Sequence, residues 1–181
     1  KSFIEQQDED LYIIARALLR KVLASQLQLP SQKISIAYSI NGKPHLPDYP
    51  NLKFNISHAD GAIAIAISSD LNIGVDIEHQ DRKFEFHRLE DFLYSESEQT
   101  RGEESFLKVW TMKAKGIGLS QPLNTIELST LENGHLIVLT TPWDSRPNWT
   151  VNSKIMHEYI ISCSVEGAVE SIPIINLKWD H

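Results

Sequence analysis

Apolar residues recur every three or four positions between residues 8 and 27, and they alternate with polar residues between 34 and 40. The first spacing predicts a helix with one buried face, which Pro30 closes. The predicted apolar stripe of this helix consists of Leu11, Ile14, Leu18, Val22 and Leu29. The second spacing predicts a half-buried strand, because successive side chains of a strand point to opposite faces. Asn41 and Gly42 follow it and are typical of a hairpin turn.

Shorter apolar runs along the rest of the chain predict further strands, at residues 52–56, 62–68, 73–77, 126–131, 136–140 and 158–165. Two segments, 89–94 and 105–112, have helical spacing, and the charged stretch 79–88 before them indicates a connection. Each half of the chain then holds a helix followed by about three strands, which predicts an α+β fold. Although no repeat is clear residue by residue, this order favours two similar α+β halves, residues 1–85 and 86–181.

The composition fits an ordinary globular protein, with 41% hydrophobic and 23% charged residues among 181. We find no apolar run near the ~20 residues of a membrane helix and no signal peptide, so we expect a cytoplasmic protein. Cys163 is the single cysteine, which excludes an internal disulfide, and its apolar surroundings predict a buried, unreactive thiol. A net charge of −7 without a dense basic stripe argues against a nucleic-acid partner.

Two carboxylates, Asp76 and Glu78, lie one residue apart within an apolar run. On a strand, residues i and i+2 share a face, so both carboxylates project side by side. Like charges this close repel each other and lose solvation in a half-buried sheet. A hard cation such as Mg²⁺, which prefers oxygen ligands, would relieve both costs. The pair therefore predicts a metal site. A glycosidase is disfavoured, because its two carboxylates flank the substrate, whereas Asp76 and Glu78 converge on one point.

Further polar candidates allow two interpretations each. Ser57 and His58, at the end of a predicted strand, could bind an anion, but capping of the local turn also explains them. Lys43 could bind a phosphate as a compact charge, or it could be a solvated lysine. Arg16 and Arg20, four positions apart on the first helix, could grip one anion together or form a solvated basic face.

The order of these candidates along the chain is more informative than any one of them. The motifs are, in sequence, Arg16-Ala17-Leu18-Leu19-Arg20, Gly42-Lys43-Pro44, Phe54-Asn55-Ile56-Ser57-His58, Gly74-Val75-Asp76-Ile77-Glu78, Tyr94-Ser95-Glu96-Ser97-Glu98 and Trp110-Thr111-Met112-Lys113. This series resembles the 4′-phosphopantetheinyl transferases of the Sfp type, over residues 8–165. The blocks around Ser57-His58 and Asp76-Ile77-Glu78 are the most specific part of the resemblance.

The resemblance implies an enzyme that transfers the phosphopantetheine arm of coenzyme A to a serine of an acyl or peptidyl carrier protein and releases 3′,5′-ADP. It implies a pseudo-dimer fold with coenzyme A and Mg²⁺ in the cleft between the halves, and a monomer can build that site alone. By the same resemblance, Asp76 and Glu78 hold Mg²⁺ against the pyrophosphate. The nucleotide end and its phosphates are held by Lys43, Ser57, His58 and, as a weaker candidate, Arg20.

The chain departs from the family pattern after Trp110. The pattern continues as Trp-x-x-Lys-Glu with a further lysine one turn on, whereas Lys113 runs directly into Ala114-Lys115-Gly116. About five residues, roughly one and a half helical turns, are absent, among them the glutamate that the family uses as third metal ligand and general base. Lys113 is the catalytic candidate that this segment retains. The segment between Glu98 and Trp110 is also short.

Two explanations fit these gaps. Either the protein lacks the residues, or the printed sequence omits them. Loss of one and a half turns from a packed helix would rotate everything after it out of register, which favours omission.

If the loss is real, the alternative function is a catalytically inactive protein that binds coenzyme A or a carrier protein. A different Mg²⁺-dependent phosphoryl enzyme is a third possibility, and preference for coenzyme A over other nucleotides separates it from the first two. Trp143 and Trp149 flank Pro147 in a predicted loop. They could form a surface for a partner, but packing against the second-half sheet is the favoured interpretation.

Overall fold

The computed structural model describes residues 3–40, 42–59, 61–80, 127–130, 136–140, 149–167 and 169–175. These residues form one long helix, α1 (Phe3–Leu27), one short 3-10 helix, η1 (Ser31–Lys33), and strands that pair in three sheets. The mixture confirms the α+β class. The predicted helices 89–94 and 105–112, the motifs at Tyr94 and Trp110, and Lys113 lie outside the described residues. The division into halves at residue 85 stays a prediction.

The helix α1 covers the predicted segment and begins earlier, at Phe3. Its buried face consists of Ala15, Leu19 and Leu23. The predicted stripe is therefore displaced by one position, and Ile14, which belonged to it, is 53% exposed. Apolar residues stand at both 18–19 and 22–23, so that spacing alone fits two faces. Packing against Phe54 selects the face with Leu19 and Leu23.

The C-terminal end of α1 is closed by a left-handed residue, Gln28, with φ 53°. The amide of Gln28 donates to the carbonyl of Ser25 at 3.4 Å, and the amide of Leu29 donates to the carbonyl of Ala24 at 3.0 Å. These two bonds are the Schellman pattern, which satisfies carbonyls that the last turn of a helix leaves without partners.

The predicted strand at residues 34–40 is shorter than expected. Only β1 (Ala37–Tyr38) forms, and it pairs with β2 (Pro44–His45) in a two-stranded sheet. The turn between them contains Gly42 at φ 77°, which favours glycine. Tyr38 is 54% exposed and Ile40 is fully exposed, because this ribbon leaves the core after Ile36, the last residue of the segment that packs on the α1 cluster.

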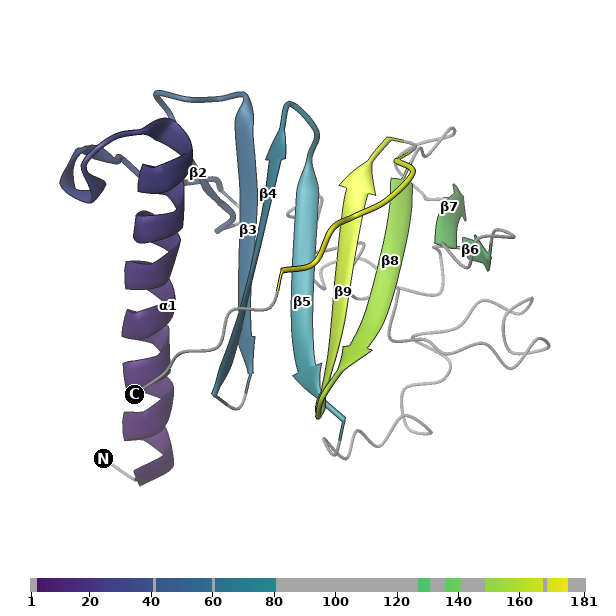
Figure 1. The fold of residues 1–181 in the computed structure, drawn as a ribbon, viewed down its shortest axis with the longest axis horizontal. Helices are drawn as coiled ribbons and strands as arrows, with labels where there is room; N and C mark the ends of the chain where they lie inside the picture. The colour runs from purple at the N-terminus through teal and green to yellow at the C-terminus, as the bar shows by residue number, and fades with distance from the viewer. Residues whose placement is uncertain are drawn as a thin grey trace.

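The hairpin of β3 (Leu52–Ala59) and β4 (Ala62–Ser69) confirms two predicted strands and extends both. The two strands pair antiparallel along their whole length, from Leu52 opposite Ser69 to Ala59 opposite Ala62. One face of the hairpin packs on α1, through a buried cluster of Leu19, Leu23, Ile34, Leu46 and Phe54. In Figure 1, α1 lies beside β3 on the opposite side of the hairpin from β5.

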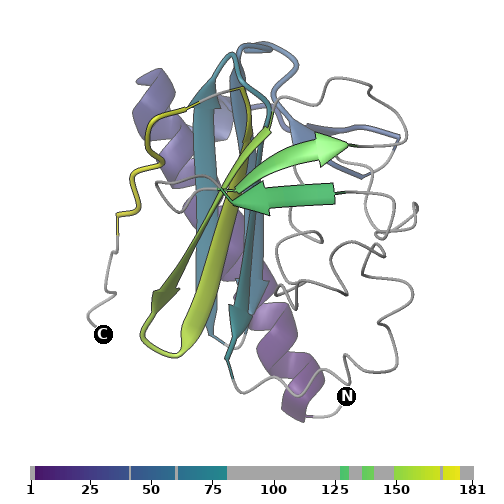
Figure 2. The same cartoon turned by 90° about the vertical axis from the view of Figure 1, so that its right-hand side faces the viewer.

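A five-stranded antiparallel sheet joins segments that are far apart in the sequence. Its strands, in spatial order, are β5 (Ile73–His79), β9 (Tyr159–Glu166), β8 (Trp149–Met156), β7 (Leu136–Thr140) and β6 (Glu127–Thr130). The strands predicted at 73–77, 126–131, 136–140 and 158–165 are thus confirmed. Figures 1 and 2 show β5 and β9 side by side, with β6 and β7 at the end of the molecule away from α1.

Strand β8 was not predicted, because its polar residues at 152–154 hide the alternation of a strand. The prediction that Trp149 lies in a loop was wrong, since it is the first residue of β8 and only 3% exposed. It is buried as a member of the sheet, and its packing against the sheet stays a prediction. Trp143 lies outside the described residues.

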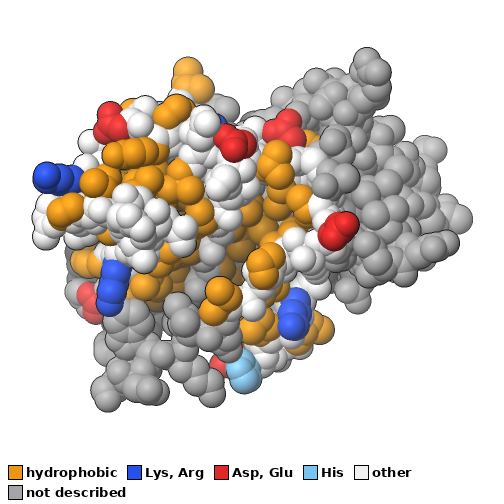
Figure 3. Space-filling model, turned by 45° about the horizontal axis from the view of Figure 1, so that its top comes forward, with side chains coloured by type: hydrophobic (Ala, Val, Ile, Leu, Met, Phe, Trp, Pro, Cys, Tyr) orange, Lys and Arg blue, Asp and Glu red, His pale blue; other side chains and the backbone are white. Residues whose placement is uncertain are grey.

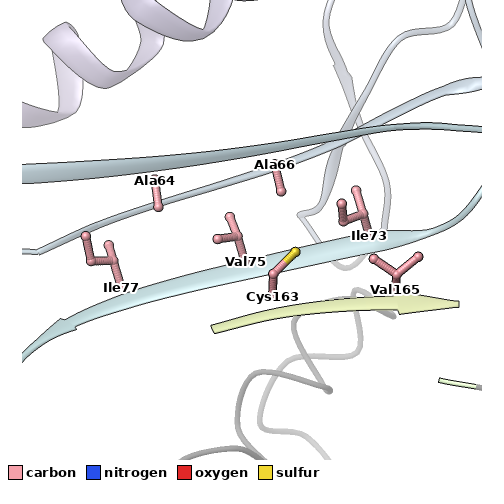
Figure 4. Close-up of a cluster of buried hydrophobic side chains, with 7 residues drawn as sticks. All are labelled: Ala64, Ala66, Ile73, Val75, Ile77, Cys163 and Val165. Atoms are coloured by element: carbon pink, nitrogen blue, oxygen red, sulfur yellow. The ribbon is translucent and has the colours of Figure 1, made fainter. Parts of the chain in front are cut away.

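A second buried cluster lies between the hairpin and the large sheet. It contains Ala64, Ala66, Ile73, Val75, Ile77, Cys163 and Val165. Figure 4 shows the two alanines of β4 pointing toward the isoleucine and valine side chains of β5. Small side chains on β4 let the strands approach closely. Cys163 is 5% exposed, as predicted, and burial raises the pKa of its thiol to about 12.

Among the described residues, few Lys and Arg side chains are visible on the face shown in Figure 3, and they lie apart from one another. Within the described parts of the chain, no helix has the length and the apolar character that crossing a bilayer requires.

Candidate active site

The two carboxylates of β5 share one face of the strand, as the spacing predicted. Asp76 is almost completely buried, at 2% exposure, while Glu78 is half-buried. In the register with β9, Asp76 lies opposite Ser162 and Glu78 opposite Ile160. Ser162 is fully buried and hydrogen-bonded to Ser153 of β8. Directly opposed residues of an antiparallel pair lie on the same face, so Asp76 stands at the end of a row of serine hydroxyls.

Strand β3 lies against β5 on its other side, and side-chain hydrogen bonds join the two. The hydroxyl of Ser57 donates to Oδ1 of Asp76 at 2.5 Å. The amide of Val75 donates to Oδ1 of Asn55 at 2.9 Å. Asn55 and Ser57 are both buried. We call this group, Asn55, Ser57, Val75 and Asp76, the β3–β5 seam.

His58 follows Ser57 on β3 and therefore points to the opposite face of the strand. It is exposed, and its ring meets the ring of Tyr12 of α1 edge to face, with 6.4 Å between centroids. Ser57 and His58 were predicted to act together. The structure places the serine at the carboxylate of Asp76 and the histidine beside α1.

Lys43 reaches β5 from the turn before β2. Its Nζ donates to the carbonyl of Ile73 at 3.2 Å, which brings the ammonium group to the start of the strand that carries Asp76. Burial lowers the pKa of Lys43, the positive charge of Lys53 lowers it further, and Glu166 opposes both effects. Lys43 is thus a partly desolvated cation at the start of β5, three residues before Asp76, and partial burial is the environment in which a charge binds phosphate strongly.

Arg20 does not share a ligand position with Arg16. Its Nη1 donates to the carbonyl of Ile34 at 2.7 Å and to that of Ser31 at 3.4 Å, which ties α1 to the segment after η1. The assignment of Arg20 to phosphate binding stays a prediction. A phosphate would have to compete with these backbone carbonyls.

Arg16 lies in a cluster of aromatic rings that the sequence reasoning missed. Its guanidinium carbon is 4.9 Å from the ring centroid of Tyr12 and 5.8 Å from that of Tyr38. Among the residues that the structure describes, Arg16 Nη1 is buried and has no hydrogen-bond partner. The spacing of Tyr12 and Arg16, one helical turn apart, is the signal that could have indicated this pair.

The donor set at Asp76 and Glu78 fits Mg²⁺. All its atoms are oxygens, and Mg²⁺ sites commonly use one or two carboxylates and complete their coordination with water and substrate phosphates. Within the described ranges, no group of three or more His, Cys, Asp or Glu side chains is arranged around a common point. Lys113 lies outside these ranges.

Comparison with known proteins gives a family and several relatives. A family model described as "4′-phosphopantetheinyl transferase, N-terminal" matches residues 1–70. The chain is 31% identical over 151 residues to the 4′-phosphopantetheinyl transferase ffp of Bacillus subtilis, an alignment covering 76% of this chain and 66% of the relative. It is 27% identical over 188 residues to the 4′-phosphopantetheinyl transferase gsp of Aneurinibacillus migulanus, covering 97% of this chain and 77% of the relative.

A vertebrate relative shows the same similarity. The L-aminoadipate-semialdehyde dehydrogenase-phosphopantetheinyl transferase of Xenopus laevis is 29% identical over 178 residues, covering 82% of this chain and 59% of the relative. The chain thus spans about two thirds of the length of the Bacillus relative and somewhat less of the Xenopus one. The resemblance predicted from the motifs is confirmed.

Proposed function

We infer that this chain belongs to the 4′-phosphopantetheinyl transferase family, and we propose that it transfers the phosphopantetheine arm of coenzyme A to a serine of an acyl or peptidyl carrier protein. The observation that carries the proposal is the geometry at β5. The strand presents Asp76 and Glu78 on one face, receives the ammonium group of Lys43 at its start, and is bound by Ser57 from the neighbouring strand. Two carboxylates on one face of a strand, with a partly desolvated cation at the start of the same strand, suit a pyrophosphate bound together with a divalent metal.

In the proposed reaction, the carrier serine oxygen forms a bond to the β-phosphorus of coenzyme A. The bond from that phosphorus to the bridging oxygen breaks, 3′,5′-ADP leaves with the electron pair, and the serine proton passes to a base. Bound Mg²⁺ would neutralise the negative charge that develops on the phosphate oxygens. Asp76 and Glu78 would hold it there.

The other described residues bind and orient. Lys43 donates to phosphate oxygens as charge builds on them, and its partial burial strengthens that interaction. His58 lies on the exposed face of β3 near α1, where it can hold a phosphate at the nucleotide end. Arg16 offers a further buried N–H group on the same side of β3. Lys113 is proposed to act on the phosphates from the segment beyond the described residues.

The alternative function is binding of coenzyme A or a carrier protein without transfer. One observation favours it. About five residues of the family motif, roughly one and a half helical turns, are absent from the sequence after Lys113. That segment would contain the glutamate expected as general base, and neither Asp76 nor Glu78 can serve as base while it holds a metal.

Intact-protein mass spectrometry tests the two functions in one experiment. The protein is incubated with coenzyme A and Mg²⁺ and with a panel of apo carrier proteins from fatty acid, polyketide and nonribosomal peptide synthesis. We expect one carrier to gain the mass of a single phosphopantetheine arm, with none gained in EDTA. Coenzyme A binding without carrier modification would support the binding protein instead. The mass of the protein itself, compared with the 20.6 kDa of the printed sequence, shows whether residues are missing from that sequence.

A further inference from the structure

The hydroxyl of Ser57 lies within the β3–β5 seam and not on the open face of β3. Ser57 is 8% exposed, and its hydroxyl donates to Asp76, which is 2% exposed. Two residues earlier on the same face of β3, Asn55 accepts from the amide of Val75. Both bonds run from β3 to consecutive residues of β5, so they fix the position of β5 beside β3 at the point where Asp76 stands.

The number of protons on a hydroxyl limits what Ser57 can do. A serine hydroxyl has one proton to donate and two lone pairs to accept with. A carboxylate and a phosphate both only accept at neutral pH. A hydroxyl that donates to Asp76 therefore has no proton left for a phosphate, and its burial also keeps a phosphate at a distance.

We propose that Ser57 is a positioning residue for the metal ligand Asp76, and that it does not bind the phosphates of coenzyme A through its hydroxyl. This inference rests on the proposed function. By donating to Oδ1, the Ser57 hydroxyl restricts the rotation of the Asp76 carboxylate, which would then present a bound metal with a fixed ligand. Partners of metal ligands act in this way at many metal sites, where their removal weakens metal binding by about 10- to 100-fold. Phosphate binding is then left to the other proposed groups, which among the described residues are Lys43, His58 and Arg16.

Four variants test the inference. Ser57→Ala and Ser57→Val remove the hydroxyl, Ser57→Thr keeps it, and Ser69→Ala on the exposed end of β4 is the matched control. Threonine and valine have nearly the same shape, so the Thr/Val pair isolates the hydroxyl from packing. Two hydroxyl-free variants of different size guard against one that fails to fold. Circular dichroism at 222 nm verifies the fold of each.

Two binding constants are measured for each variant. One is the Kd for Mn²⁺, a paramagnetic substitute for Mg²⁺, obtained by electron paramagnetic resonance in the presence of coenzyme A. The other is the Kd for coenzyme A in EDTA, obtained by isothermal titration calorimetry. We expect the loss of the hydroxyl to raise the Kd for Mn²⁺ on the order of 10-fold and to leave the Kd for coenzyme A in EDTA unchanged. Ser57→Thr and Ser69→Ala should keep wild-type values of both.

The opposite pattern overturns the inference. If Ser57→Ala and Ser57→Val weaken coenzyme A binding in EDTA and leave the Kd for Mn²⁺ unchanged, Ser57 is a phosphate ligand. If neither constant changes, Ser57 has neither role and the inference is also wrong. Failure of the proposed function looks different, because the wild-type protein would then modify no carrier protein in the mass-spectrometric assay, whatever the Ser57 variants do to the two binding constants.

Discussion

At the scale of single residues, the burial of Asp76 sets what its substitution should do. The carboxylate is 2% exposed, accepts a hydrogen bond from Ser57 and shares a face of β5 with Glu78. Without a cation, the two carboxylates repel each other and lose solvation. An acidic pair retained at this cost is more useful for binding a metal than for folding, so activity and stability should respond to its loss in opposite directions.

The variant Asp76→Asn keeps the shape of the side chain and removes its charge. We expect transfer to fall by on the order of 10²-fold or more, because a metal ligand is lost, while the thermal midpoint stays equal or rises. Transfer is measured by mass spectrometry of the carrier, and stability by circular dichroism. The control Asp70→Asn makes the same change on an exposed turn at φ 71°, where asparagine is tolerated, and should leave both quantities unchanged. Full Mg²⁺-dependent activity of Asp76→Asn would show that the metal assignment is wrong.

The thiol of Cys163 gives a second prediction at this scale. Burial raises its pKa from 9.0 to about 12, so the reactive thiolate at pH 8 is about 10³-fold scarcer than in the unfolded chain. We expect iodoacetamide at pH 8 to leave the native protein unmodified for hours and to alkylate it within minutes in guanidinium chloride. Intact mass reports the single adduct, since the chain has one cysteine. Rapid alkylation of the native protein would contradict the burial of this residue.

The residue-scale predictions from the sequence succeeded where one local pattern decided the outcome. The shared face of Asp76 and Glu78 follows from the two-residue period of a strand alone. The bond between Ser57 and Asp76 does not, because it joins two strands that have no backbone ladder between them, and their relative position depends on the packing of Ala64 and Ala66 against β5. The separation of Arg16 from Arg20 likewise depends on where the chain after η1 returns to the helix.

At the scale of elements, strands with continuous apolar runs were predictable and the others were not. β3, β4, β5 and β9 are each buried on at least one face along most of their length, so their sequences show it. β8 has exposed polar residues in its second half and was missed. For α1, the spacing indicated a helix but fitted two faces equally well. The choice between them is made by contacts with β3 and β4, which a helical period cannot show.

The left-handed end of α1 provides the prediction at this scale. Gln28 occupies φ 53°, where a β-carbon is strained and glycine is not. We expect Gln28→Gly to raise the free energy of unfolding by about 0.5–1 kcal/mol. Gln26 lies two residues earlier, within the helix and on its exposed side. Its replacement by glycine should lower the free energy of unfolding by up to about 1 kcal/mol. Urea unfolding of both variants measures the difference. Equal effects at the two positions would contradict the Schellman end.

At the scale of the whole molecule, the β3–β4 hairpin links two clusters of buried side chains. Its one face packs on Leu19 and Leu23 of α1, and its other face, with Ala64 and Ala66, packs on β5. Strand β5 is in turn paired with β9, from the far end of the chain, along seven register positions from Ile73 to His79. The proposed metal ligands thus sit on a strand that is held by both the first and the last described parts of the sequence.

This arrangement predicts that α1 and β9 unfold together, although they are far apart in the sequence and, in the described part of the chain, are linked through the hairpin and β5. Leu23→Ala, in the α1 cluster, should lower the stability of both by about 2–5 kcal/mol, the usual cost of a large cavity. Hydrogen exchange with mass spectrometry, at increasing urea, measures peptides from α1 and from β9 separately. Leu71 is exposed, so Leu71→Ala serves as the control and should change the hydrogen exchange of neither the α1 nor the β9 peptides. If Leu23→Ala accelerated exchange in α1 alone, the helix would be an independent unit, and the β3–β5 seam would have to hold the metal ligands in place without help from the α1 cluster.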